Sequence, residues 1–294
     1  MQPLSNKKRY TYLIILSTLC IALIPFLVLY ARGYRLNDAW SVVQTGGIYV
    51  NPQVSGAMIY IDDKSIEQTG LFQRSVLKQN LKKGNHKVAI LKDNYRYWEK
   101  TVSVGDQLVT ELHPFLLPTT IKEREVLPFS DTSGQATSTR TKIKNTEYED
   151  ILAYFNATTT VKTKNISVSA TTTIDQRENL IQRNKLELWI DTGDVSVVWK
   201  GDPEGVPYYF CITQQCTSKG LVDLEKDIKD FDFLPGRDDV IVVSTDTGLY
   251  AVELDGRFGR AVELLRVFKN PDVDFVVKDN SLFVKEGTVI TELM

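Results

Sequence analysis

A long uncharged stretch near the start of the chain constrains the fold more than any other feature. The 22 residues from Tyr10 to Ala31, YTYLIILSTLCIALIPFLVLYA, contain no Asp, Glu, Lys or Arg. A helix of that length measures roughly 33 Å at about 1.5 Å per residue, and the hydrocarbon core of a bilayer is roughly 30 Å thick. We therefore predict one transmembrane helix over residues 10–31, kinked but not broken at Pro25.

The charges that flank this stretch predict its orientation. A basic run at residues 7–9 precedes it, whereas Arg32 and Arg35 follow it. Because positive residues favour the cytoplasmic side, we expect residues 1–9 to form a cytoplasmic tail and the rest of the chain to be extracytoplasmic. The alternative is a cleaved signal peptide. The apolar run is longer than a typical signal core and lacks a small-x-small cleavage site, so an uncleaved signal anchor in the cell membrane is favoured.

The three cysteines agree with an extracytoplasmic location. Cys20 lies in the membrane segment, where it acts as a small apolar residue. Cys211 and Cys216 lie close together in YYFCITQQCTSKG, and in an oxidising compartment we expect a local disulfide between them. A zinc site would need more ligands, and His86 and His113 are far away in the sequence, so we predict no metal site.

Short runs of alternating apolar residues follow the membrane segment. They occupy residues 48–50, 57–61, 77–81, 88–90, 98–104 and 108–112, with Gly, Pro, Asn or Asp between them. Alternation with a period of two, interrupted by turn residues, is typical of antiparallel strands. The sequence therefore predicts a small antiparallel β-sandwich over residues 45–118.

Residues 119–182 differ in composition from the sandwich. Ser, Thr, Lys and Asn dominate this segment, as in DTSGQATSTRTK, and we predict a Ser/Thr-rich connector. TEYEDILAYF, at residues 146–155, forms an amphipathic island within it. Asn156 and Asn165 match the acceptor pattern for glycosylation, which matters only in a host that glycosylates such sites.

Strand signals return in residues 183–294. Ten short apolar runs alternate with turns that contain Asp or Gly: KLELWID, VSVVWKG, VPYYFCI, DFDFLPG, DVIVVST, GLYAVELD, AVELLRV, VDFVVKD, SLFVKEG and TVITEL. The pattern resembles propeller blades, but the segment is shorter than three blades of roughly 40 residues. We expect an incomplete propeller-like or other antiparallel β domain whose open edges allow pairing between copies of the chain, giving a homo-oligomer.

The charge of this C-terminal region excludes one class of partner. Residues 184–294 contain 12 basic and 21 acidic residues. An acidic surface repels phosphate backbones, so we predict no nucleic-acid partner.

The first β module carries a recognisable set of residues. A Pro and a Gly-Ala pair precede an alternating strand that ends in Asp, and a Gly-x-His-x-Val strand, a Tyr and an aromatic residue follow. These features fall on Pro52, Gly56-Ala57, Ile59–Asp62, residues 84–88, Tyr95 and Trp98. Residues 45–116 thereby resemble the PEGA domain, a small β-sandwich common in bacterial and archaeal surface-layer and envelope proteins.

The module departs from that family at two places. The tetrapeptide that gives the family its name has Val54 and Ser55 in place of Pro and Glu, and Asn94 stands where Gly is usual before the Tyr. Asn tolerates the left-handed conformation that this turn needs. The resemblance implies an extracytoplasmic module and no catalytic residues.

Two Asp-Thr-Gly triplets, at residues 191–193 and 246–248, raise the possibility of an aspartic protease, in which two such carboxylates share a proton. We interpret both as turns between antiparallel strands, because they are only 55 residues apart. Asp194 and Leu249 also stand where that enzyme class has small residues.

Other motifs for chemistry are weak. The Asp pairs at residues 230/232, 238/239 and 272/274 lack the layout of a calcium loop and are expected to be solvated turn carboxylates. The sequence contains neither a nucleotide-binding loop nor a Gly-x-Ser-x-Gly nucleophile motif. We expect His86 to be a packing or hydrogen-bonding residue, and we predict no catalytic residues and no cofactor.

The aromatic stretch at residues 82–104 is expected to divide between the two faces of a sheet. Alternation places Trp98 in the core with Val88 and Ile90. It leaves Arg96 and Tyr97 near the surface, where we predict a small contact patch.

Together these features predict a single-pass membrane protein with extracytoplasmic β domains. We expect a non-enzymatic envelope protein that binds or scaffolds a surface protein or a cell-wall or surface polymer. One alternative is a cell-surface hydrolase with its site in the C-terminal domain. Another is an accessory subunit of a membrane complex.

Overall fold

The computed structural model describes residues 6–36, 40–129, 140–157, 178–212, 215–269 and 273–293. The chain is mainly β, with several antiparallel sheets and one N-terminal apolar helix, as the sequence predicts. It divides into two compact units. The first consists of Met1–Lys92 and Tyr97–Pro114, and the second of Asp93–Arg96 and Phe115–Met294.

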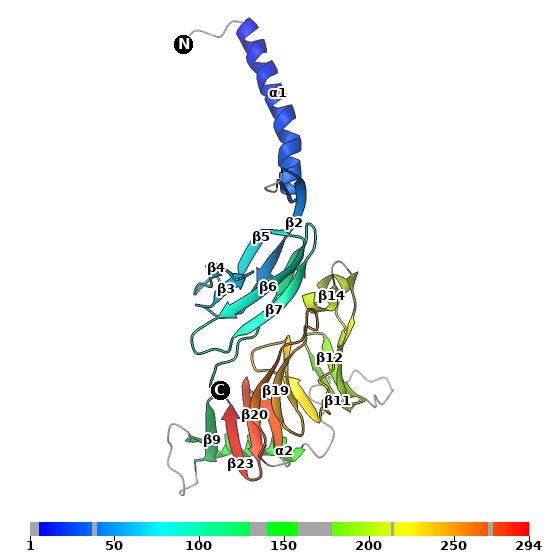
Figure 1. Cartoon of the computed structure of the whole chain (residues 1–294). Coiled ribbons are helices and arrows are strands. Elements are labelled where there is room, and N and C mark those ends of the chain that lie inside the picture. The colour runs from blue at the N-terminus through cyan, green and yellow to red at the C-terminus, as the bar shows by residue number, and fades with distance from the viewer. Residues whose placement is uncertain are drawn as a thin grey trace. The chain divides into compact units, whose positions relative to one another are not determined.

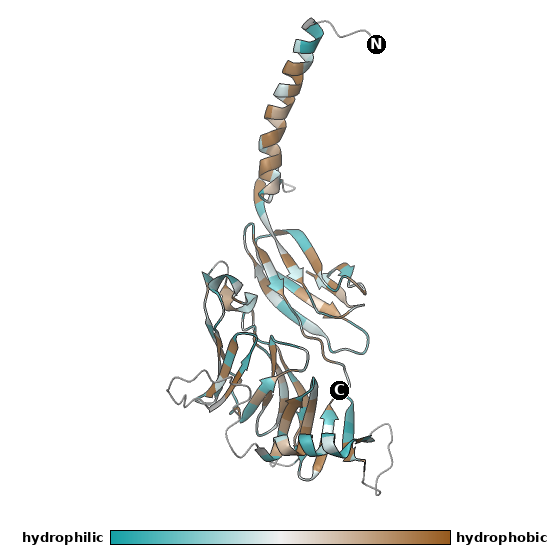
Figure 2. Ribbon diagram, turned by 180° about the vertical axis from the view of Figure 1, so that it is seen from behind, coloured by the Kyte–Doolittle hydropathy of each residue, from teal (hydrophilic) through white to brown (hydrophobic). Residues whose placement is uncertain are grey.

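The first unit begins with helix α1 (Asn6–Ala31), which is apolar over most of its length (Figures 1 and 2). None of its apolar window is buried by the rest of the chain. The hydroxyls of Thr11 and Thr18 donate hydrogen bonds to the carbonyls of Lys7 and Ile14, so these polar groups are satisfied within the helix. The helix is long and apolar enough to cross a membrane.

Two four-stranded sheets complete the first unit. One has the order β1–β2–β5, with β8 also paired to β2, and the other has the order β4–β3–β6–β7. Their strands are β1 (Tyr34–Leu36), β2 (Val42–Val50), β3 (Met58–Ile61), β4 (Lys64–Gln68), β5 (Val76–Lys82), β6 (Gly84–Leu91), β7 (Trp98–Val104) and β8 (Val109–Leu112). One pairing departs from the antiparallel pattern that we expected. β8 runs parallel to β2, because the chain crosses from one sheet to the other after β7 instead of turning back as a hairpin.

The core of this sandwich is the one that alternation predicts. Side chains of β7 are buried and exposed in strict alternation, with Trp98, Val102 and Val104 inside. Ile90 lies directly opposite Trp98 in the β6–β7 pair, and Val88 is fully buried on the same strand. The predicted place of Trp98 in the core is confirmed.

Three larger sheets and a two-stranded one, which joins Cys211–Ile212 to Gln215–Cys216, form the described part of the second unit. The three larger sheets have four or five strands each. The first sheet contains β11 (Glu178–Arg183), β12 (Leu186–Asp191), β13 (Asp194–Trp199) and β16 (Lys219–Val222). The central sheet contains β17 (Asp230–Phe233), β18 (Val240–Ser244), β19 (Gly248–Glu253) and β20 (Val262–Val267). The last sheet contains β21 (Val273–Lys278), β22 (Ser281–Glu286), β23 (Val289–Leu293), β9 (Glu123–Pro128) and β10 (Arg140–Ile143).

Strand β18 of the central sheet is covered on both faces, and each of its residues is buried. Ile241 and Val243 pack in one core with Leu188 of the first sheet. Val242 points the other way and packs with Phe275 of the last sheet. A strand covered on both faces is apolar at consecutive positions, which explains the run VIVV in this strand.

The segment predicted as a connector contributes to the second unit. Its described part contains β9, β10, the start of β11 and helix α2 (Asn145–Ala157). Helix α2 covers the amphipathic island at residues 146–155. Ile151 and Phe155, one helical turn apart, are buried against the last sheet with Val126. Both residues belong to TEYEDILAYF, the amphipathic island named from the sequence. Two glycosylation acceptor patterns were noted in the sequence. The structure does not describe Thr158, the third residue of the pattern at Asn156, or any residue of the pattern at Asn165.

A second departure concerns VPYYFCI, which we expected to be one strand. Tyr208–Phe210 form a short 3-10 helix, η2, and only Cys211–Ile212 pair as strand β14. Pro207 lacks an N–H for a sheet ladder, and its carbonyl accepts a hydrogen bond from the Phe210 N–H, which closes the turn.

The sheets of the second unit do not close into a barrel within the described residues. β9 precedes the first sheet in the chain but pairs with β23, the last described strand. The propeller-like interpretation and the pairing of open edges between copies stay predictions.

Candidate functional site

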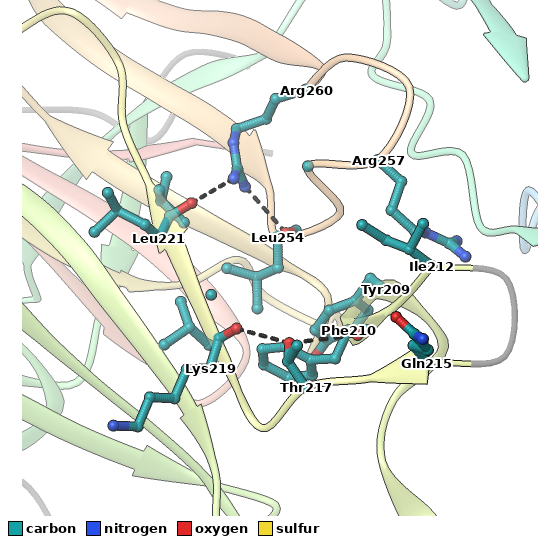
Figure 3. A pocket seen from close by; sticks show the side chains of 14 residues that line it. Tyr209, Phe210, Ile212, Gln215, Thr217, Lys219, Leu221, Leu254, Arg257 and Arg260 are labelled. Atoms are coloured by element: carbon teal, nitrogen blue, oxygen red, sulfur yellow. Dashed lines mark hydrogen bonds between the residues drawn. The ribbon is translucent and has the colours of Figure 1, made fainter.

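A pocket of about 420 Å³ lies in the second unit, at the boundary of the first and central sheets (Figure 3). Its walls come from η2, strand β16, the loop between β19 and β20, and a short hairpin of β14 and β15 (Gln215–Cys216). Segments that are distant in the sequence therefore build one concave surface.

A disulfide closes the hairpin at the edge of this pocket. Cys211 and Cys216, the pair selected from the sequence, lie opposite each other in β14 and β15 and are joined by the bond. Cys20 is a free, exposed cysteine of α1. The covalent link holds Ile212 and Gln215 on either side of the hairpin tip, both of them lining the pocket.

Apolar side chains form the base and the rim of the pocket. Phe210, Val222 and Leu254 line the base and belong to the core shared by the first and central sheets. At the rim, Ile212 is 71% exposed and Leu221 is 51% exposed. Exposed aliphatic side chains next to a concave apolar base are a common feature of surfaces that bind partners.

Arg260 links the two sheets behind the rim. Its Nη1 donates to the carbonyl of Glu253 at 2.6 Å. Figure 3 shows its two other bonds, from Nη1 to the carbonyl of Leu254 (3.0 Å) and from Nη2 to the carbonyl of Leu221 (2.6 Å). Burial lowers the pKa of Arg260, and the nearby carboxylates of Glu253 and Asp255 act in the opposite direction. The guanidinium is engaged with backbone oxygens and acts as a structural clamp.

Arg257 is held in place by Asp255, which is 1% exposed. The Arg257 Nε and Nη2 atoms each lie 2.9 Å from a carboxylate oxygen of Asp255, a bidentate pair. Its Nη1 donates to the carbonyl of Cys211 at 3.2 Å. This arginine therefore fixes the disulfide hairpin to the central sheet.

Polar groups complete the lining. The Thr217 hydroxyl donates to the carbonyl of Lys219 at 3.0 Å, and the ammonium-bearing side chain of Lys219 is exposed. Burial raises the pKa of Tyr209, with Asp239 acting in the same direction, so its phenol stays neutral. The site combines apolar walls with neutral donors and one exposed cation, an arrangement suited to recognition.

The structure places both Asp-Thr-Gly triplets in hairpin turns. Thr192 and Gly193 connect β12 to β13 with positive φ angles of 52° and 92°. The second triplet connects β18 to β19, where the Thr245 N–H donates to the Gly248 carbonyl. Asp246 forms an ion pair with Lys229. The turn interpretation accounts for both triplets.

No group of three or more His, Cys, Asp or Glu side chains placed to hold a metal ion occurs among the described residues. Asp272, one member of the three Asp pairs, lies outside them.

The predicted contact patch divides between the two units. Arg96 belongs to the second unit, where its Nη1 donates to Glu263 Oε2 at 2.7 Å and to the Leu264 carbonyl at 2.8 Å. Tyr97 belongs to the first unit, is 54% exposed and bonds to Glu99 through its hydroxyl. That hydrogen bond raises the pKa of Tyr97. The patch stays a prediction, with Tyr97 as its exposed member.

Sequence reasoning missed the two arginines of the pocket. Arg257 and Arg260 lie in LDGRFGRA, where glycines interrupt two strands. A Cβ on Gly256 would lie 2.9 Å from the Arg260 guanidinium, so a glycine there gives the arginine room. Two arginines in a glycine-containing loop are a signal that could have been noted, but their partners are distant in the sequence.

Comparison with curated proteins gives no match. Comparison with protein families does. The sequence model of the PEGA domain matches residues 45–116, so the β-sandwich of the first unit is a PEGA domain, as the placement of its Asp, His and aromatic residues predicted.

Proposed function

We propose that the chain is a single-pass membrane protein that carries a non-enzymatic binding or scaffolding module for another protein of the cell envelope. The main observation behind this proposal is an apolar helix long enough to span a bilayer. Three residues after its end, the chain enters a sheet of the PEGA domain. An anchor joined to this module fits an envelope protein.

The proposed orientation puts the N-terminus in the cytoplasm and both β units outside. Basic residues 7–9 precede the uncharged stretch of α1 and outnumber Arg32 and Arg35 after it, which favours this direction of insertion. The disulfide between Cys211 and Cys216 supports it, because such bonds persist in oxidising compartments.

The pocket of the second unit supports a protein as the partner. Its base is apolar, and Ile212 and Leu221 expose aliphatic surface at the rim. An aliphatic or aromatic side chain of a partner would be desolvated there, as anchor residues are at the centre of protein interfaces. Lys219 at the edge provides a cation for a carboxylate on the same partner.

Site-specific photocrosslinking in living cells tests the binding role. A photoreactive residue at Ile212 is expected to capture an envelope protein. The same residue at Val267, which is 59% exposed on β20, is the matched control and is expected to capture none. Capture of wall polymer at Ile212 would favour the polymer alternative. Equal labelling at both positions, or none at either, would contradict a binding role for the pocket.

Topology is tested separately by protease shaving of intact cells. The proposal expects digestion of both β units from outside and protection of an epitope fused before residue 7. Protection of the β units would contradict the orientation. Turnover of a peptide or glycan by the purified full chain would contradict the non-enzymatic role.

A further inference from the structure

The end of the membrane helix is fixed to the PEGA domain without a flexible linker. The Gly33 N–H donates to the Tyr30 carbonyl at 3.1 Å, which extends the end of the helix. The Gly33 carbonyl accepts hydrogen bonds from the Thr45 N–H (3.0 Å) and the Thr45 hydroxyl (2.9 Å). Thr45 is 6% exposed within β2, so the sheet starts within roughly 10 Å of the helix end, given about 3.4 Å per residue.

A groove of about 500 Å³ lies at this junction, entirely within the first unit. Lys82 and Lys83 line one side, and both are exposed. Lys83 is 2.7 Å from Asp106. Tyr34 lines the groove as well, and its hydroxyl oxygen accepts a hydrogen bond from Gln44 at 2.6 Å. This bond uses the hydroxyl oxygen as an acceptor, so the hydroxyl proton of Tyr34 is available to donate to a ligand oxygen.

Further cations and aromatic rings lie in residues 30–36 and 40–42, the described parts of the segment that leads from the helix end to the lining of the groove. Arg32 follows the helix directly and is exposed. The Arg35 guanidinium stacks 3.7 Å from the centre of the Tyr30 ring and donates to the Tyr30 carbonyl. Trp40 is 85% exposed, and Val42 beside it is 60% exposed. Tyr and Trp rings with nearby Arg and Lys are typical of the boundary between hydrocarbon and headgroups.

The length of the helix places the groove in that layer. The uncharged stretch spans roughly 33 Å against a hydrocarbon core of roughly 30 Å, so Ala31 lies at its boundary. The headgroup layer extends roughly 5–7 Å further on each side, and it contains the next few residues. The cations of the groove therefore lie at the depth of lipid phosphates, on the side of the membrane where the β units lie.

We propose that this groove binds the phosphate of an anionic phospholipid headgroup. Lys82 and Lys83 outnumber Asp106, the one carboxylate that lines the groove, and give it a net positive charge. The Tyr34 hydroxyl donates a hydrogen bond, and Trp40 contacts the upper acyl chain. The inference rests on the proposed membrane anchoring of α1. It goes beyond that anchoring, because a helix alone has no preference for one lipid. Binding of the headgroup would also fix the orientation of the PEGA domain relative to the membrane surface.

The test uses the full chain in phosphatidylcholine vesicles that contain a minor fraction of either brominated phosphatidylglycerol or brominated phosphatidylcholine. Bromine quenches nearby tryptophan, and the difference between wild type and Trp40→Phe isolates the signal of Trp40. We expect stronger quenching by phosphatidylglycerol. In Lys82→Gln/Lys83→Gln the preference is expected to fall about thirtyfold, from the usual attraction of two lysines to an anionic surface.

Lys64→Gln/Lys122→Gln is the matched control, since it removes two exposed lysines that do not line the groove and is expected to keep the preference. Equal quenching by both lipids in wild type, or equal loss in control and groove variants, overturns the inference while leaving the anchor intact. Competition by soluble glycerol phosphate would assign the groove to a free phosphate and overturn the lipid assignment. A chain that fails to float with the vesicles overturns the anchor and the groove together.

Discussion

The imidazole of His86 bridges two elements of the PEGA domain by contacting Asp62. Its Nδ1 lies 2.6 Å from Asp62 Oδ2, and its Nε2 lies 2.7 Å from the carbonyl oxygen of Lys82. The other carboxylate oxygen of Asp62 accepts the N–H of Lys87 at 3.1 Å. The Asp that ends one strand and the His of the Gly-x-His-x-Val strand are thus direct partners, which gives a physical reason for their joint presence in the family pattern.

Because both ring nitrogens face acceptors, the geometry favours the doubly protonated imidazolium. Burial alone would lower the pKa of His86, but the bonds to Lys82 and Asp62 outweigh it and raise the pKa. For Asp62, burial would raise the pKa, and the bonds to His86 and Lys87 lower it. Because the pKa of His86 is raised in the folded state, its protonated form stabilises the fold. This contribution is complete at pH values below about 6.5, the pKa of histidine in the unfolded chain, and it is lost as the pH rises through the folded pKa. The aspartate contribution is present above its unfolded pKa of about 3.9 and is lost as the pH falls through the folded pKa.

Replacing His86 is therefore expected to have a pH-dependent cost. His86→Gln should lower the free energy of unfolding of the full chain by about 1 kcal/mol, a value reduced by the exposure of Asp62. The cost should be largest between about pH 4 and 6.5 and should shrink at higher pH. Denaturant unfolding at a series of pH values checks this, with His113→Gln as the control for the other histidine of this unit. The same pH profile in both variants would show that the Asp62 contact is not its source.

The disulfide is expected to matter more for the pocket than for the whole unit. It closes a loop with a sequence separation of only five residues, so the loop-entropy estimate gives a loss of about 2 kcal/mol on removal. Cys211→Ser/Cys216→Ser should thus fold, but with its hairpin less fixed. Denaturant unfolding measures the loss of stability, and the yield of crosslinking from Ile212 measures how firmly the hairpin is held. Cys20→Ser is the control, and a crosslinking yield that survives removal of the bond would show that the hairpin geometry is unimportant.

Arg260 is expected to stabilise the second unit through its three backbone contacts. Arg260→Lys keeps the charge but cannot reproduce a planar guanidinium that reaches Leu221, Leu254 and Glu253 together. Leaving these carbonyls without their donor should cost about 2 kcal/mol of unfolding free energy.

Arg183→Lys is the comparison, because Arg183 forms an exposed pair with Asp238 and should lose no more than about 0.5 kcal/mol. Chemical denaturation of the two variants in parallel decides the matter. Similar small losses would mean that Arg260 is not a clamp between the sheets.

Local patterns in the sequence predicted the parts of the structure that are themselves local. The uncharged stretch became α1, and period-two alternation placed Trp98 in the core. The first Asp-Thr-Gly triplet became a turn because the two-residue connection at residues 192–193 needs positive φ, which glycine supplies.

Contacts between distant segments had no such signal. The pairing of β9 with β23 joins the two ends of the second unit, and strand composition does not specify which distant strand is the neighbour. The contact of Arg260 with the Leu221 carbonyl is invisible for the same reason, since a backbone oxygen carries no residue identity. The candidate pocket therefore emerged from the fold, whereas only its disulfide was predicted from the sequence.

The turn between β12 and β13 offers a test that separates conformation from catalysis. Thr192 has a φ of 52°, which β-branched residues disfavour, and Gly193 has a φ of 92°. Thr192→Asn should raise the free energy of unfolding by about 0.5 kcal/mol, because Asn-Gly suits a turn with two positive φ angles. Gly193→Ala should lower it by about 1 kcal/mol through backbone strain, since a Cβ there meets only Asp227 at an ordinary 3.5 Å.

Asp191→Asn completes this series, because it removes a carboxylate that a protease would need while leaving the turn unchanged. For Asp191→Asn we expect an unaltered free energy of unfolding and an unaltered crosslinking yield from Ile212. Gly205→Ala is the control for Gly193→Ala, because Gly205 has no positive φ. Denaturant unfolding of all four variants checks the expected order of stabilities, in which the free energy of unfolding of Thr192→Asn lies above that of wild type and that of Gly193→Ala lies below it. A hydrolytic activity of the full chain that disappears in Asp191→Asn would contradict the turn interpretation, because a residue needed only for chain reversal has no role in bond cleavage.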